Sequence, residues 1–223
     1  DVTVSRGLGD VYKRQDVLTV QGKYQFKPSL PFTPGIEVSG VIKKVGKDVK
    51  MRKVGDEVIS TLQTGAFASE VVTSENSTFL KGNMSFEQAA GFALTYGTSY
   101  YALKQRARLV AGETVLVLGA AGGVGVATIQ LAKAMGANVI AAASNDTKLD
   151  FAEEAGADLR INYTNENLKE RVKELTNGQG ADVIYDPVGG DFSEQAFRAI
   201  AWNGRFLVIG FASGPVSYTH LTL

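Results

Sequence analysis

Cysteine is absent from the 223-residue sequence, and histidine occurs only once. A chain without cysteine forms no disulfide, carries no thiolate nucleophile and cannot build a cysteine-containing metal site, and one histidine cannot supply a histidine cluster. An excess of charge of one sign is also lacking, because 23 basic side chains balance 23 acidic ones, so no basic footprint indicates a nucleic-acid partner. What remains is a chain long enough to bury one large core or two small ones.

An uncharged stretch of 19 residues lies between Glu113 and Lys133, close to the length of a membrane span. Glycines interrupt it in the middle, a strand rich in valine and leucine precedes them, and an apolar helix follows. A buried strand–turn–helix explains the stretch better than a membrane helix does. With no signal-peptide pattern visible, we expect a soluble, cytoplasmic protein with no membrane partner.

Both ends of the sequence lack the periodicity of a helix or a strand. Residues 1–15 and 216–223 resemble translated sequencing-adapter read-through, with ordinary frayed termini as the alternative. We therefore expect both segments to be non-native and base the fold prediction on residues 16–215. His220 falls outside that span.

Residues 16–90 are rich in strand and turn signals and predict a small β domain. Strands are expected at residues 36–45, 56–60 and 68–73. Ser85 and Gln88 form a capping-box pattern that begins a helix through Ala90. A second helical stretch is expected at residues 95–107.

From Glu113 onward, strands and helices alternate, which predicts a doubly wound parallel sheet in an α/β domain over residues 91–215. The predicted strands are residues 115–118, 138–143, 159–162, 181–185 and 205–209. The predicted helices are residues 124–135, 146–155, 165–176 and 192–200. Dinucleotide-binding sheets of this type usually have six strands, so we expect this one to be truncated at strand five.

The loop after the first of these strands carries a glycine fingerprint. The pattern G-x-G-x-x-G places Ala120, Gly122 and Gly125 at its three glycine positions, with a small residue making the first turn. Gly122 would let the backbone approach a pyrophosphate, which would sit at the positive end of the following helix, and Gly125 would let that helix pack on the strand. A Walker loop is excluded because Val126 stands where lysine is required. A purely structural strand–helix turn is the alternative.

The end of the second strand indicates which dinucleotide binds. Sites for NAD place Asp or Glu there to hold the ribose 2′-hydroxyl, whereas this chain has Ser144, with Lys148 shortly after. The missing carboxylate and the nearby cation favour the 2′-phosphate of NADP. Asp146 is the counter-argument, since it could be a displaced ribose ligand, although it also suits the start of the next helix.

Nine stretches of the chain resemble the zinc-free, medium-chain NADPH:quinone oxidoreductase family, the group that includes zeta-crystallin. They are DVLTVQGKY, PFTPGIEVSGVI, KVGDEV, GAFASEVV, LTYGTSYYAL, VLGAAGGVGVATIQLAKAMGA, INY, DVIYDPVGGD and RFLVIGFASG. The resemblance implies a partial GroES-like catalytic domain joined to a Rossmann domain, and a homodimer when the protein is full length.

The same resemblance implies roles for individual residues. Thr98 would lie beside the cofactor, and Gly122, Gly123 and Val124 would contact the pyrophosphate. Ser144, Lys148 and Tyr163 would surround the 2′-phosphate. Val188, Gly210 and Phe211 would lie near the nicotinamide. For each residue a purely structural role is the alternative to cofactor binding. Tyr163 and Phe211 could be packing aromatics, and Lys148 could be a solvent-exposed charge on a helix.

Two departures from the family's wider pattern concern the catalytic domain. Zinc-binding relatives carry Gly-His-Glu where this chain has Gly35-Ile36-Glu37, and isoleucine cannot bind a metal. The motif Asn-x-x-Asp would end at Asp16, but Lys13 stands at its first position, inside the segment expected to be non-native.

These features predict hydride transfer from NADPH to a quinone or an α,β-unsaturated carbonyl without a metal, since conjugation spreads the developing negative charge. Tyr24 is the candidate hydroxyl for protonation, and a loop aromatic lining the cleft is its alternative. Two other functions stay open, namely an NADPH-binding protein with incidental redox activity and the enoyl-reductase module of a larger synthase.

Overall fold

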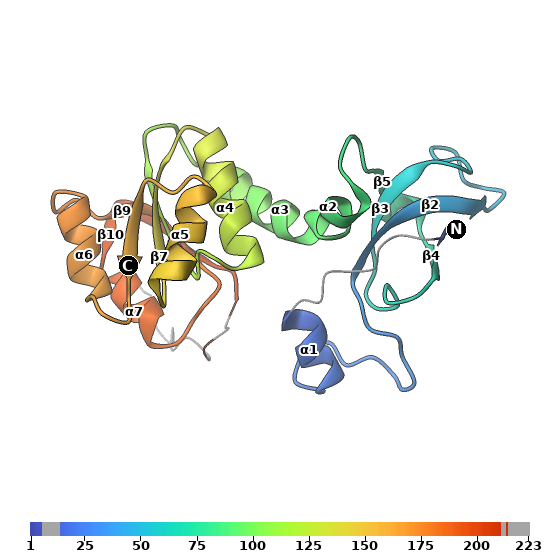
Figure 1. Ribbon diagram of the computed structural model, residues 1–223, viewed down its shortest axis with the longest axis horizontal. Coiled ribbons are helices and arrows are strands. Elements are labelled where there is room, and N and C mark those ends of the chain that lie inside the picture. The colour runs from blue at the N-terminus through green and yellow to red at the C-terminus, as the bar shows by residue number, and fades with distance from the viewer. Residues whose placement is uncertain (6–13, 211–212, 214–223) are drawn as a thin grey trace. The chain divides into compact units, whose positions relative to one another are not determined.

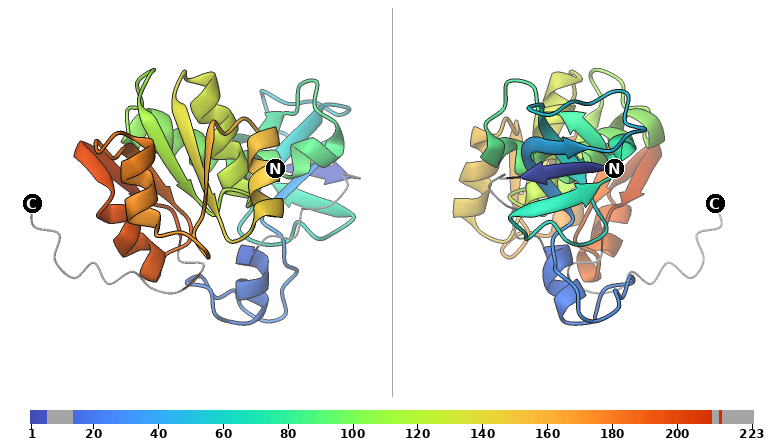
Figure 2. Two further views of the ribbon diagram at one scale, coloured as in Figure 1. Left: turned by 60° about the vertical axis from the view of Figure 1, so that its left-hand side comes forward. Right: turned by 90° about the vertical axis from the view of Figure 1, so that its right-hand side faces the viewer.

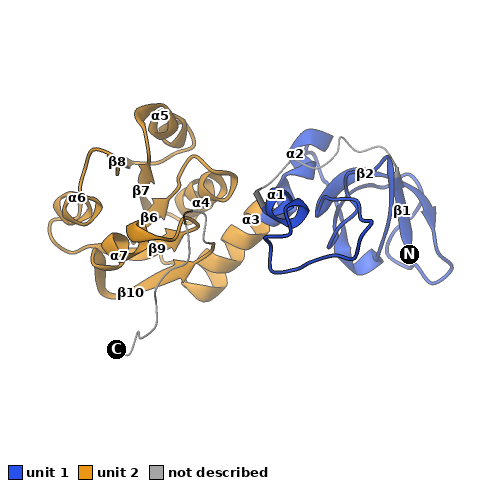
Figure 3. Cartoon of the chain, turned by 90° about the horizontal axis from the view of Figure 1, so that it is seen from below, with its two compact units in different colours: residues 1–94 blue, residues 95–223 orange. Residues whose placement is uncertain are grey.

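The structure is a computed structural model that describes residues 1–5, 14–210 and 213 of the chain. It consists of two compact units, residues 1–94 and residues 95–223 (Figure 3). None of the helices in the described ranges combines the length and apolar character needed to cross a bilayer.

The first unit contains a five-stranded antiparallel sheet with the strand order β4-β1-β2-β3-β5. Its core is small and aliphatic, because alternate residues of the strands face inward, among them Val38, Ile42 and Val58. The strands are β1 (Val2–Ser5), β2 (Glu37–Val45), β3 (Glu57–Thr61), β4 (Glu70–Thr73) and β5 (Thr78–Leu80), and the helices are α1 (Arg14–Val20), the 3₁₀ turn η1 (Glu75–Ser77) and α2 (Phe86–Ala90).

Strand β1 lies in a segment that the sequence analysis had left out of the fold. It pairs with both β2 and β4, and Val2 and Val4 are buried in the core. Four residues are too few for a period-2 signal to stand out, and both partners of β1 are far away in sequence. The non-native origin of residues 1–15 stays a prediction, and residues 6–13 lie outside the described ranges.

The capping box at the start of α2 is confirmed. The Ser85 hydroxyl accepts a hydrogen bond from the Gln88 backbone N–H at 3.2 Å, and the Gln88 side chain accepts one from the Ser85 N–H at 3.0 Å. The two residues satisfy donors that the first helical turn would otherwise leave unpaired.

The second unit is a parallel sheet with helices on both faces, which confirms the predicted α/β class (Figures 1 and 2). The strand order is β10-β9-β6-β7-β8. The strands are β6 (Thr114–Leu118), β7 (Asn138–Ala143), β8 (Leu159–Asn162), β9 (Ala181–Asp186) and β10 (Ile200–Val208). The helices are α3 (Phe92–Tyr100), which continues as the π-helical segment η2 (Tyr101–Arg106), α4 (Gly123–Ala134), α5 (Asp146–Glu154), α6 (Leu168–Leu175) and α7 (Asp191–Phe197).

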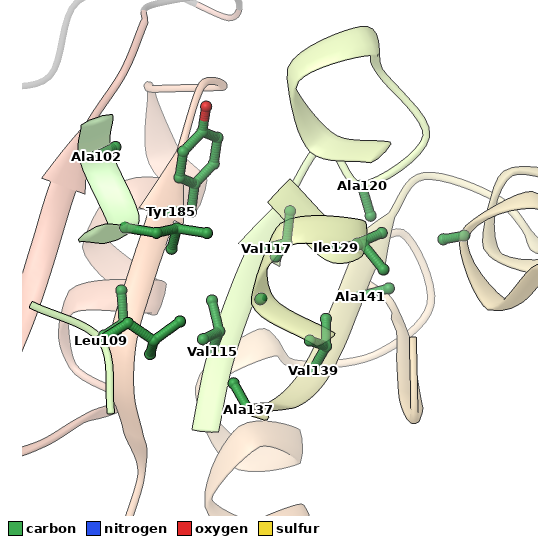
Figure 4. Close-up of a cluster of buried hydrophobic side chains, with 14 of the residues drawn as sticks. Ala102, Leu109, Val115, Val117, Ala120, Ile129, Ala137, Val139, Ala141 and Tyr185 are labelled. Carbon is green, nitrogen blue, oxygen red and sulfur yellow. The ribbon is translucent and has the colours of Figure 1, made fainter. Parts of the chain in front are cut away.

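Two apolar clusters, one on each face of this sheet, form the core of the second unit. On one face, side chains of β6, β7 and β9 pack with Ile129 of α4 and Leu149 of α5 (Figure 4). On the other face, Leu116 and Ile184 pack with Leu168 of α6 and with α7. The uncharged stretch after Glu113 is therefore β6 and α4, a buried strand and helix, as the sequence predicts.

Several elements differ from the sequence prediction: α1 and β5 were not expected, the helix expected at residues 192–200 ends at Phe197, and two further differences concern a helix and a strand. The helix expected at residues 95–107 widens after Tyr100, where the Ala107 N–H bonds the Ala102 carbonyl five residues back at 2.8 Å. Strand β10 begins at Ile200, whereas the sequence predicts residue 205. Its pairing with β9 is irregular between Ile200 and Arg205, so the first part of the strand lacks a regular strand pattern. The left-handed Asn203, with φ at 61°, is a turn signal that hid the continuity of the strand.

Candidate functional site

The turn from β6 into α4 is built on three glycines. Gly119 has a positive φ of 58°, a conformation that a Cβ disfavours, and Gly122 is the N-cap residue of α4. The sequence analysis assigned Ala120 to the first glycine position, whereas the residue with the left-handed conformation is Gly119, which gives the spacing G-x-x-G-x-x-G. Ala120 is buried in the apolar core, and Gly119 makes the turn out of the strand.

Gly125 stands where the strand end and the helix come closest. A Cβ at this position would lie 2.5 Å from the Gly119 carbonyl oxygen and 2.7 Å from that of Ala120. Both neighbours are backbone atoms, so no side-chain rotation could relieve the clash. Only glycine allows this approach, as the fingerprint predicts.

The N-terminus of α4 is open to solvent. Gly122 and Gly123 are exposed, and no side chain caps the helix. The free N–H groups of the first turn and the positive end of the helix dipole make this position suited to an anion such as a pyrophosphate.

Helix α3 packs against the same turn. A Cβ on Gly123 would lie 3.3 Å from the Thr95 methyl group, and Thr98, one turn further along α3, is partly exposed. The structure thus brings Thr98 into the element that borders the glycine turn, but no described contact joins its side chain to that turn.

A buried hydroxyl network fixes α3 to α4. The hydroxyl groups of Ser99 and Tyr185 are 3.0 Å apart, and Thr128 Oγ1 donates to the Val124 carbonyl at 2.7 Å and lies 3.0 Å from Ser99 Oγ. Burial raises the pKa of the Tyr185 hydroxyl, which lies at the edge of the apolar cluster in Figure 4, so it stays protonated and able to donate. Sequence analysis missed this network, because its hydroxyl groups come from α3, α4 and β9, which are far apart in the chain.

The predicted 2′-phosphate residues come together at the carboxyl ends of β7 and β8. Lys148 Nζ donates to Ser144 Oγ at 2.8 Å, and the Tyr163 hydroxyl bonds to the Ser144 side chain. Burial raises the pKa of Tyr163, with the Ser144 bond acting in the opposite direction, and its ring centroid lies 4.3 Å from that of Phe192. One cation and two hydroxyl groups therefore share a single, partly exposed position.

Asp146 lies in the first turn of helix α5 and has a hydrogen-bond partner there. Asn145 is the N-cap residue, accepting from the Lys148 N–H at 3.0 Å, and Asp146 is in the first turn, where its Oδ1 accepts from Asn162 Nδ2 at 3.2 Å. The helix-start interpretation of Asp146 accounts for this geometry.

Two further predicted residues lie on loops that follow β9 and β10. A Cβ on Gly119 would lie 3.0 Å from Val188 Cγ2, so the loop after β9 packs against the glycine turn. The Gly210 N–H bonds the Asp186 carbonyl at 3.3 Å. Phe211 lies outside the described residues. Val188 and Gly210 therefore both follow the carboxyl ends of parallel strands, where sheets of this type bind ligands.

The first unit contains a separate cavity of about 280 Å³. Tyr24, Phe26, Ile36, Leu62 and Leu94 supply its apolar and aromatic lining, and it is completed by Gln15, Thr61 and Gln63. A small apolar pocket with a few hydroxyl and amide groups suits a flat, weakly polar molecule. Sequence analysis predicted Tyr24 as a site residue and named Ile36 only as a residue without a metal ligand atom. The other members lie at residues 15, 26, 61–63 and 94, and most of them are far from Tyr24 in the chain.

An antiparallel β unit followed by a parallel, glycine-turn unit defines a two-domain dehydrogenase architecture. Residues 12–111 match the family described as alcohol dehydrogenase GroES-like domain, and residues 123–223 match the one described as zinc-binding dehydrogenase. The chain belongs to the medium-chain dehydrogenase/reductase family, with quinone oxidoreductases and quinone oxidoreductase-like proteins among its relatives.

Three relatives illustrate the likeness. The quinone oxidoreductase-like protein 2 homolog of Nematostella vectensis is 47% identical over 204 residues, which are 90% of this chain and 56% of that protein. The Escherichia coli quinone oxidoreductase, solved in complex with NADPH, superposes with a TM-score of 0.92 at 35% identity, covering 99% of this chain and 68% of that one. The Pseudomonas syringae quinone oxidoreductase gives 0.91 at 37% identity, with coverage of 99% and 68%. The chain thus spans little more than half the length of the Nematostella relative.

Zinc, which one family description names, does not fit the residues present. Ile36 offers no ligand atom, the chain has no cysteine, and the described residues contain no group of three His, Cys, Asp or Glu side chains placed to hold a metal ion.

Proposed function

We propose that the protein represented by this chain is an NADPH-dependent oxidoreductase that transfers hydride to a quinone or an α,β-unsaturated carbonyl without a metal. The observation that carries the proposal is the group of Ser144, Lys148 and Tyr163 at the end of β7 and β8, in the same unit as the uncapped start of α4. A cation with two hydroxyl groups suits a phosphate, and an open helix start suits a pyrophosphate.

The residues fit NADPH at separate points. Gly122 and Gly123 are exposed at the uncapped start of α4, where the N–H groups of Gly123 and Val124 would hold the pyrophosphate, with Gly125 allowing the turn to form. Lys148 would pair with the 2′-phosphate, while Ser144 and Tyr163 would supply hydroxyl hydrogen bonds. Val188 and Gly210 would lie against the nicotinamide, and Thr98 beside the cofactor. When bound, NADPH supplies the hydride from C4 of its nicotinamide ring.

Preference for NADPH over NADH follows from charge. Ser144 stands at the end of β7 where a carboxylate would bind a ribose 2′-hydroxyl and repel a phosphate, and the nearby Asp146 accepts a hydrogen bond from Asn162. Charge-assisted hydrogen bonds contribute about 1.5–3 kcal/mol, which corresponds to roughly ten- to hundredfold tighter binding of NADPH.

We propose that the cavity of the first unit takes the hydride acceptor. Its aromatic and aliphatic walls favour a planar conjugated ring, and delocalisation in such an acceptor reduces the need for a metal or a positioned cation. The Tyr24 hydroxyl is the proposed proton donor in this cavity. In its full-length form the protein would be a homodimer, which light scattering can test.

The test is NADPH oxidation followed at 340 nm with benzoquinone, naphthoquinone and enone acceptors, with and without a chelator. Turnover that a chelator leaves unchanged supports the proposal. Lys148→Ala should lower the preference for NADPH over NADH, and Lys169→Ala on the exposed side of α6 is the matched control. Tight NADPH binding without turnover of any acceptor would instead support a nucleotide-binding protein with no reductase function.

A further inference from the structure

Asp186, the last residue of β9, is a fully buried carboxylate that the proposed chemistry does not use. Its Oδ1 accepts hydrogen bonds from the N–H of Val188 at 2.8 Å and from the N–H of Gly189 at 3.0 Å. Its Oδ2 accepts one from the Ser193 hydroxyl in the first turn of α7. A buried charge is costly unless hydrogen bonds compensate it, and here they come from the loop that the residue precedes.

The backbone of the same residue holds a second loop. The Asp186 carbonyl accepts from the N–H of Ile209 at 2.8 Å and from that of Gly210 at 3.3 Å, directly after β10. Strands β9 and β10 are neighbours in the sheet, and α7 packs on both (Figures 1 and 3). One residue therefore ties together the loops after two adjacent strands.

The loop after β9 also reaches the glycine turn. Val188 Cγ2 approaches within 3.0 Å of the Cβ position of Gly119, and Gly189 and Gly190 have φ values of 73° and 65°. Left-handed glycines give this loop many alternative conformations. The hydrogen bonds to Asp186 select one of them and hold Val188 over the start of the dinucleotide site.

We propose that Asp186 is a positioning residue for the nicotinamide half of NADPH, acting through Val188 and Gly210. This inference rests on the proposed function, which assigns those two residues to the nicotinamide. Asp186 should affect one half of the ligand more than the other, because no described hydrogen bond joins it to Ser144, Lys148 or Tyr163, which lie after β7, in α5 and after β8. Helix α7 reaches that group through the ring of Phe192, which packs on Tyr163. Loss of Asp186 should weaken binding of the nicotinamide half and leave the adenosine half bound as before.

The experiment compares two ligands on the purified full-length protein by calorimetry. NADPH contains both halves, and adenosine 2′,5′-bisphosphate contains the adenosine and its 2′-phosphate only. Asp186→Ala should raise the Kd for NADPH at least tenfold and change the Kd for the bisphosphate less than twofold. Asp186→Asn keeps an oxygen acceptor for the two N–H groups and should restore NADPH binding to within about threefold of wild type.

Asp182→Ala is the matched control, since Asp182 lies at the other end of β9 and its Oδ2 accepts from the Thr114 N–H at 2.8 Å. Asp182→Ala should lower thermal stability, and any change in Kd should be the same for NADPH and for the bisphosphate. If Asp186→Ala does not fold, Ser193→Ala removes one donor and should weaken NADPH binding about two- to threefold, again sparing the bisphosphate.

Equal weakening of both ligands in the folded Asp186 or Ser193 variants, or no weakening of either, would overturn the inference. A wild-type protein that binds neither ligand would instead refute the proposed function, so the two failures are distinguishable.

Discussion

Replacing Gly125 by alanine tests the dinucleotide turn where the structure gives its sharpest steric constraint. The added Cβ would meet the Gly119 and Ala120 carbonyl oxygens at 2.5 and 2.7 Å, and the Ala120 carbonyl carbon at 2.9 Å. Overpacking of this kind costs about 1–3 kcal/mol, while the better helix propensity of alanine returns at most about 1 kcal/mol. Because the clash is with backbone atoms, the upper part of that range, about 2–3 kcal/mol, applies, and the net loss of about 1–2 kcal/mol should lower Tm by roughly 2–8 °C. Since α4 must move away from β6, the Kd for NADPH should rise at least tenfold.

Gly122→Ala is the matched comparison. Gly122 has φ at −76° and ψ at 162°, which alanine adopts freely, and the nearest atom to its Cβ position is the Gly119 carbonyl oxygen at 3.2 Å. We expect stability to change by less than about 1 kcal/mol, because the methyl group makes one tight contact, with the Gly119 carbonyl oxygen, that a small shift can relieve. NADPH binding should still weaken, because that methyl group lies on the exposed surface where the pyrophosphate approaches.

The assays are thermal unfolding followed by circular dichroism and NADPH titration followed by nicotinamide fluorescence. The two variants should separate, with Gly125→Ala losing stability and binding and Gly122→Ala losing binding alone. A Gly125→Ala protein with wild-type Tm and wild-type NADPH affinity would refute the close-approach argument.

Three other changes test the site and its support. Lys148→Ala should reduce the NADPH-over-NADH preference by about tenfold or more, measured as the ratio of the two Kd values; an unchanged ratio would remove Lys148 from the 2′-phosphate site. Tyr24→Phe should lower the turnover number with NADPH binding intact, and turnover equal to wild type would leave Tyr24 as a wall of the cavity. Glu113→Gln should destabilise the protein by about 1 kcal/mol at neutral pH, because Glu113 pairs with Arg205 through bonds of 2.9 and 2.7 Å and this pairing holds the pKa of Glu113 below its ordinary value of 4.5. The stabilisation is complete above the ordinary pKa and disappears as pH falls through the lowered pKa. The difference in free energy of unfolding between the Gln variant and wild type should therefore shrink in urea titrations below pH 4.5. A difference that stays constant with pH would contradict the assignment.

Much of the second unit follows from local sequence signals. Strands β7 and β8 have the predicted bounds, because the preceding helices end at Gly136 and Gly156, whose φ values of 82° and 114° suit glycine, and a short strand run follows each glycine. The group of Ser144, Lys148 and Tyr163 was predictable for a related reason. Each residue lies at or just after a strand end, and the carboxyl ends of parallel strands meet at one edge of the sheet.

Features that depend on distant contacts could not be predicted in this way. Ser99 and Tyr185 are 86 positions apart, and nothing in either local sequence indicates that their hydroxyl groups meet. Asp186 resembles any acidic residue at a strand end until its loop is seen to fold back onto it. Strand β1 is too short to show a period, and its place in the sheet depends on partners at β2 and β4.

The most direct test of the central claim, a dinucleotide site selective for the 2′-phosphate, is a calorimetric titration of the full-length protein with NADPH and with NADH at one ionic strength. The account predicts that NADPH binds at least tenfold more tightly than NADH. Equal affinities, or tighter binding of NADH, would contradict it.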